Sequence, residues 1–125
     1  MLQKFVLITG ALDYLVGLGT WYGAVSDPVP QHFVPLLTLG MFLMMAAACL
    51  VWASKDIAGR APVIVWQGLV RLSAAAAVLY AVPAGLAGEE LYGLVVFDGM
   101  IGLVYVFGTL RVTGRSMLQL LAWRD

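Results

Sequence analysis

Long apolar segments alternate with short polar ones along the whole chain, and this pattern is the strongest signal in the sequence. Each apolar segment supplies about 20 residues, which is the length that a helix needs to cross the hydrocarbon core of a bilayer. We predict helices over 5–25, 34–53, 62–82 and 91–111. The sequence therefore predicts an all-α integral membrane protein.

The connections between these helices are short and rich in turn-forming residues. They cover 26–33, 54–61 and 83–90, and each contains proline or glycine. Short connections place consecutive helices side by side and antiparallel. We therefore expect a single transmembrane domain, residues 1–125, folded as an up-down four-helix bundle.

Composition agrees with this class and removes several others. Hydrophobic residues make up 62% of the 125 residues and charged residues 11%, about half the charged share of a soluble domain. The net charge is zero, so nothing in the charge balance favours nucleic acid. The one cysteine, Cys49, excludes a disulfide framework and is expected to be a small core residue. We find no cofactor motif, and His32 stands alone, without the further ligands that a metal would need.

The basic residues predict which side of the membrane each connection faces. Apart from Arg71, lysine and arginine occur before the first helix, between the second and third, and at or after the end of the fourth: Lys4, Lys55, Arg60, Arg111, Arg115 and Arg124. The other two connections carry only the acidic residues Asp27, Glu89 and Glu90. By the positive-inside rule, both termini lie in the cytoplasm (N-in/C-in).

The cytoplasmic tail, residues 112–125, is too short to span the bilayer. Its apolar residues alternate with Arg115, Gln119 and Arg124. Two arrangements remain open: an amphipathic turn or two in the membrane interface, or an extension of the fourth helix.

Three charged residues lie inside the predicted spans, where each costs at least ~2.5–3.5 kcal/mol at the bilayer centre. Counted from the periplasmic helix ends, Asp13 lies about 18 Å deep, Arg71 about 16 Å and Asp98 about 10 Å. A guanidinium donates hydrogen bonds from a planar fork that suits carboxylates. We predict that Arg71 pairs with at least one of the two aspartates in the bundle interior.

Neighbouring residues extend this charged cluster. Gln67 lies one helical turn before Arg71, and Tyr105 follows Asp98 by seven residues. We therefore predict Asp13, Gln67, Arg71, Asp98 and Tyr105 as a ligand or proton site, and we assign no catalytic residue. Two aspartates against one arginine leave an excess negative charge, which a bound proton or cation could neutralise. The alternative is a structural ion pair that fixes the helix register.

Glycines near the charges are expected to let the helices approach closely. Gly17 lies on the face of Asp13, and Gly102 follows Asp98 by one turn. Gly19 and Gly23 also match the spacing of a helix-contact motif.

Two short stretches carry a resemblance to a known family: Gly-Leu-Val-Arg-Leu over 68–72 and Asp98-Gly99. With the span pattern over most of the chain, they resemble the small four-helix bacterial membrane proteins grouped as DoxX-like. Some members of this group are accessory subunits of membrane redox or stress systems, so the resemblance implies a place in the bacterial inner membrane and an accessory role. It carries over no site residue. Small multidrug resistance transporters similarly place an acid in the first helix, as Asp13 is placed, but they lack a partner like Arg71. Dual-topology fluoride channels are less similar, because the asparagine-containing pore pattern is missing.

Three functions follow as hypotheses. The first is a non-enzymatic accessory subunit, or a subunit that binds a ligand or lipid, because no catalytic constellation is recognisable. The second is a proton-coupled transporter of a small solute, because of the unbalanced acid at membrane depth. The third is an intramembrane enzyme acting on a lipid or quinone, with Asp98 as acid or base and Arg71 holding a polar head. The expected partners are the lipid bilayer, a lipophilic ligand or quinone, and a membrane protein or a second copy of the chain.

Overall fold

The computed structural model describes residues 1–122, and the regular structure in this range is helical. Four long helices are α1 (Leu2–Ser26), α2 (Phe33–Ser54), α3 (Ala61–Ala81) and α4 (Tyr92–Thr113). A 3₁₀ turn, η1 (Glu89–Leu91), precedes α4, and a short helix, α5 (Met117–Leu121), follows it. Each long helix begins and ends within three residues of the predicted limits. This arrangement is compatible with the predicted four-helix bundle.

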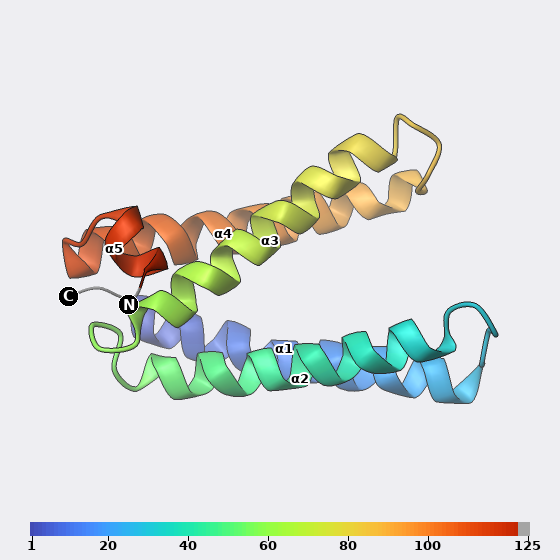
Figure 1. Cartoon of the computed structure of the whole chain (residues 1–125), viewed down its shortest axis with the longest axis horizontal. Coiled ribbons are helices and arrows are strands. Elements are labelled where there is room, and N and C mark those ends of the chain that lie inside the picture. Colours follow the sequence, from blue (N-terminus) through green and yellow to red (C-terminus); the bar gives the residue numbers. More distant parts are fainter. Residues whose placement is uncertain (123–125) are drawn as a thin grey trace. The chain divides into compact units, whose positions relative to one another are not determined.

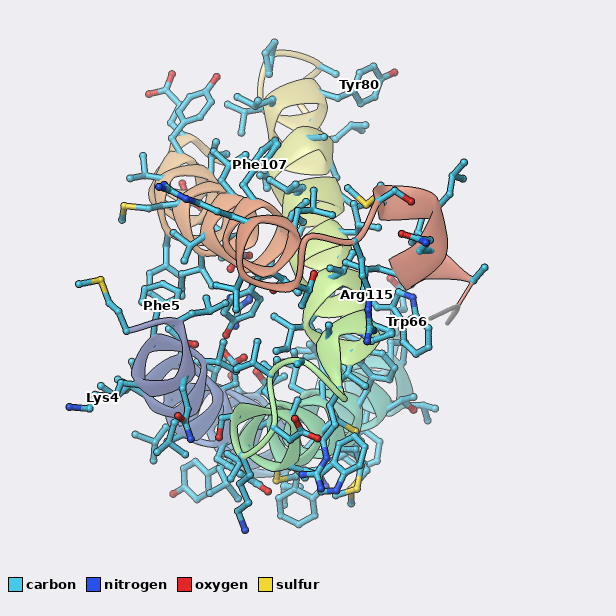
Figure 2. All side chains as sticks on the ribbon, turned by 90° about the vertical axis from the view of Figure 1, so that its left-hand side faces the viewer. Lys4, Phe5, Trp66, Tyr80, Phe107 and Arg115 are labelled. Atoms are coloured by element: carbon cyan, nitrogen blue, oxygen red, sulfur yellow. The ribbon has the colours of Figure 1, made fainter. Side chains whose placement is uncertain are left out.

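All four long helices are long and apolar enough to cross a membrane. Between 22% and 33% of the most apolar window of each helix is buried, so most of their apolar surface faces outward. Tyr80, for example, projects away from α3 (Figure 2) and is 72% exposed. A water-soluble domain rarely exposes apolar patches of this extent. The outer faces of these helices are therefore suited to apolar surroundings.

The described chain divides into two compact units, each built on a helical hairpin (Figure 1). The first unit, Met1–Asp56, contains α1 and α2. The second unit begins at Ile57 and contains α3, α4 and α5. The single transmembrane domain stays a prediction.

Glycines set the contact between α1 and α2. A Cβ added to Gly17 would lie 3.0 Å from the carbonyl oxygen of Gly40, and one added to Gly40 would lie 3.0 Å from that of Gly17. Nearer the start of α1, Gly10 meets Leu50, close to the end of α2, so the helices are antiparallel. A Cβ on Gly19 or Gly23 would meet no atom within 4 Å. The motif made by these two glycines therefore makes no helix contact among the described residues.

Cys49 is exposed on α2, so its assignment as a core residue was wrong. The buried stripe of α2 includes Gly40, Ala47 and Leu50. Cys49 is one residue from Leu50, which turns it about 100° around the helix and away from that stripe. The apolar pattern of α2 could not reveal this difference, because nearly every residue of the helix is apolar.

The tail turns back after α4 and does not extend it. Gly114 ends α4 in the left-handed conformation, with φ of 67°, which glycine adopts without a Cβ penalty. Ser116 then caps α5: its hydroxyl accepts from the Gln119 N–H at 3.2 Å, and the Gln119 side chain accepts from the Ser116 N–H at 2.9 Å. Leu120 packs in a buried cluster with Ala61 and Val65 of α3. The extension alternative is therefore wrong, and Arg124 lies outside the described residues.

Ser116→Ala should weaken α5 locally, because it removes the acceptor for the Gln119 N–H. A lost N-cap costs about 1 kcal/mol, so the amides of α5 should exchange with deuterium about fivefold faster. Hydrogen exchange measured by mass spectrometry checks this. Ser73→Ala, at an exposed position of α3, is the control and should leave α5 unchanged. Unchanged exchange in Ser116→Ala would show that packing on α3 alone holds the helix.

Candidate functional site

The three charged residues predicted to lie deep in the membrane, Asp13, Arg71 and Asp98, lie on the buried stripe of their own helix. On α3, the positions spaced three and four residues apart around Arg71 are buried: Ala61, Ile64, Gly68, Ala75 and Val78. On α4, the buried Gly102, Tyr105 and Thr109 continue from Asp98 at the same spacing. On α1, Asp13 lies between Gly10 and Gly17 on the stripe that also contains Val6 and Ala24. Each charge thus lies where its helix is buried, at the spacing of a packing seam.

Arg71 and Asp98 form an ion pair across the α3–α4 hairpin. Nη1 of Arg71 donates to Oδ1 of Asp98 at 2.8 Å. The two side chains are 11% and 13% exposed. The predicted pairing of Arg71 with an aspartate is therefore confirmed for Asp98.

A close glycine contact brings these two side chains together. A Cβ added to Gly68 would lie 3.0 Å from the carbonyl oxygen of Gly102, and one added to Gly102 would lie 2.9 Å from that of Gly68. Arg71 lies three residues after Gly68, and Asp98 lies four residues before Gly102. Because α3 and α4 are antiparallel, three residues forward on α3 and four residues back on α4 both lead toward the same end of the hairpin. The backbone contact at the glycines therefore places arginine and aspartate at the same level.

Tyr105 is the third member of the site within this hairpin. Its side chain is fully buried, and Cζ of Arg71 lies 5.5 Å from the centroid of its ring. At this distance the ring attracts the guanidinium through its quadrupole. Arg71 of α3 is therefore held by a carboxylate and by an aromatic ring that both belong to α4.

Gln67 and Asp13 are the remaining residues of the predicted site. Gln67 is half-buried on α3, one turn before Arg71. Asp13 is half-buried on α1, in the other unit. Its membership of a three-charge cluster with Arg71 and Asp98 stays a prediction.

Sequence reasoning missed Thr109, although its spacing could have revealed it. It follows Tyr105 by one turn on the buried stripe of α4 and is fully buried. Its Oγ1 has no hydrogen-bond partner in the described chain. Its spacing was the available signal, but a threonine inside an apolar helix is usually satisfied by its own backbone, so it was not singled out.

The second unit also has a shallow hollow, on the face of α4 turned away from this stripe. It is lined by Leu103, Val104, Phe107, Gly108 and Arg111, all of them from α4. Its lining includes neither Arg71 nor Asp98. Among residues 1–122, no three histidine, cysteine or acidic side chains gather closely enough to hold a metal ion.

Chemically, the hairpin presents one cation and one anion that neutralise each other between apolar helices. Such a pair can hold two helices in register. It can also respond to a polar ligand that competes for the guanidinium, or to a proton on the carboxylate.

Comparisons with protein-family models, with curated proteins and with solved structures find no match to this chain. The DoxX-like resemblance therefore stays a prediction. The function has to be argued from the site itself.

Proposed function

We propose that this protein is a non-enzymatic subunit of a larger system in the bacterial inner membrane. It crosses the membrane four times, with both termini in the cytoplasm, and it binds a lipophilic ligand or a partner membrane protein. The observation that carries this proposal is the Arg71–Asp98 ion pair between two apolar helices.

The membrane placement is supported by the helices and by the charges that flank them. Four helices have the length and composition of membrane spans. Lysine and arginine lie at only one end of each of them, apart from Arg71, as the positive-inside rule requires. Lys4 points away from α1 (Figure 2), so it is free to reach lipid headgroups. Charged residues inside membrane spans are rare, and those that occur usually face the protein interior and serve a function.

The binding role is favoured over catalysis by the way in which the charges are used. Asp98 is engaged by Arg71, and the guanidinium lies against the ring of Tyr105. The hollow of the second unit lies on the opposite face of α4. We therefore assign Asp98 to the binding of Arg71 and not to acid–base catalysis.

Native mass spectrometry of the full chain, extracted gently from its own membrane, tests this proposal. The wild-type chain should be released together with a partner polypeptide, a lipid, a quinone or another small apolar molecule. Asp98→Asn keeps the size of the side chain but removes the charge that Arg71 binds, so it should release less of that partner or ligand. Arg71→Lys keeps the positive charge but loses the planar fork of the guanidinium, so it should also release less of that partner or ligand.

The matched control is Lys55→Ala, which removes an exposed cation from the connection between α2 and α3. It should retain whatever the wild-type chain binds. If the wild-type chain is released bare, or if its bound molecule persists in both Asp98→Asn and Arg71→Lys, the proposed role of the ion pair is wrong.

A further inference from the structure

A polar stripe runs along one face of α4 and extends well beyond the ion pair. Asp98, Tyr105, Thr109 and Thr113 follow one another at spacings of seven, four and four residues. With 3.6 residues per turn, these spacings place them on one side of the helix. The other residues of α4 between Gly93 and Leu110 are apolar.

Arg71 bridges the one gap in this stripe. Gly102 lies between Asp98 and Tyr105 and has no side chain. The guanidinium of Arg71 bonds to Asp98 at 2.8 Å, and its Cζ lies 5.5 Å from the ring centroid of Tyr105. Polar contact therefore continues from the carboxylate across the arginine to the tyrosine.

Thr109 lacks the hydrogen bond that comparable threonines make. The hydroxyls of Thr9, Thr20 and Thr113 donate to a backbone carbonyl four residues earlier, at 2.7, 2.9 and 2.7 Å. The Thr109 side chain is fully buried, and its Oγ1 has no partner in the described chain. A buried hydroxyl without a hydrogen bond destabilises the folded chain, because it has given up its hydrogen bonds to water. The unpaired Oγ1 of Thr109 therefore points to a partner that the described polypeptide does not supply.

The stripe reaches the surface at the C-terminal end of α4. Thr113 Oγ1 donates to the Thr109 carbonyl at 2.7 Å and accepts from the Arg115 N–H at 3.3 Å. Thr113 is half-buried, and the next residue, Gly114, is exposed. Along this stripe, burial thus falls from the fully buried Thr109 to the half-buried Thr113.

We propose that Thr109 Oγ1 binds a water molecule, and that water reaches the Arg71–Asp98 pair along this face of α4 from its C-terminal end. Water suits the position because internal waters typically bind to buried polar groups that lack another partner. The ionisable groups along the route are Arg71 from α3 and Tyr105 and Asp98 from α4, with Arg115 at its mouth. The inference rests on the membrane placement proposed above, in which this end of α4 faces the cytoplasm. The route then lets the Asp98 carboxylate exchange protons with cytoplasmic water.

Water-edited solid-state NMR of the full chain in lipid bilayers tests this proposal. The chain is labelled with ¹³C in its five threonines and five aspartates, and Thr109→Val and Asp98→Asn assign the two signals of interest. Both signals should receive magnetisation quickly from water. In Thr109→Val, which keeps the shape but removes the hydroxyl, the Asp98 signal should lose this fast transfer.

Two variants serve as controls. Thr109→Ser keeps the hydroxyl and should keep the fast transfer to Asp98, so a change in Thr109→Val alone is not a packing effect. Thr20→Val removes a hydroxyl that is bonded to its own backbone and should leave Asp98 unchanged. A Thr109 signal without transfer from water overturns the proposal, and so does an Asp98 signal that Thr109→Val does not alter. Native mass spectrometry detects a partner or ligand independently of water, so this inference and the proposed function fail separately.

Discussion

Arg71→Ala should cause the largest loss of stability that we expect from any single substitution in the α3–α4 hairpin. It leaves the Asp98 carboxylate, 13% exposed, without its cation, and breaking a buried ion pair in this way costs about 3–5 kcal/mol. The variant also removes the group that packs on the ring of Tyr105. The free energy of unfolding, measured in bicelles by steric trapping, gives the size of the loss.

The double variant Arg71→Met with Asp98→Leu separates charge from packing. It replaces the pair with apolar side chains of similar volume, and such replacements are often neutral or stabilising. The double variant should recover most of the stability that Arg71→Ala loses. Arg111→Ala, which removes an exposed arginine, is the control and should lose little stability. If Arg71→Ala is as stable as Arg111→Ala, the ion pair contributes nothing to the hairpin.

Gly68→Ala should be the second most damaging change, despite adding a single methyl group. The new Cβ would lie 2.8 Å from Cγ2 of Val106 and 3.0 Å from the carbonyl oxygen of Gly102. The carbonyl belongs to the helix backbone and cannot rotate away, so α3 and α4 must separate. Overpacking of this kind costs about 1–3 kcal/mol. The same unfolding measurement checks it.

Gly99→Ala is the matched control on the facing helix, because a Cβ at Gly99 would meet no atom within 4 Å. Alanine favours a helix over glycine by about 0.5–1 kcal/mol, so this variant should be slightly more stable than the wild-type chain. The two glycine variants are therefore expected to shift stability in opposite directions. A shift of the same sign in both would mean that the Gly68–Gly102 contact does not hold the hairpin.

The residues of the site were predictable to different degrees. A charge inside an apolar segment is conspicuous in any sequence, so Arg71, Asp98 and Asp13 were found without a structure. That Arg71 and Asp98 face each other could not be read from the sequence, because depth along a helix says nothing about rotation around it. The Gly68–Gly102 contact brings these two side chains together by setting both the register and the distance of α3 and α4. Thr109 was missed because its importance lies in a hydrogen bond that it does not make.

The sequence by itself determined the four apolar helices and their limits to within three residues, because helix length and hydropathy are local properties of the chain. It also placed charges among residues that are otherwise apolar. The tertiary structure decided which glycines meet, which way the tail turns and which face of α2 is buried. In helices that are apolar on every side, no change in polarity marks the inner face. Close backbone contacts, such as those at Gly17 and Gly68, show which face each helix turns toward its partner.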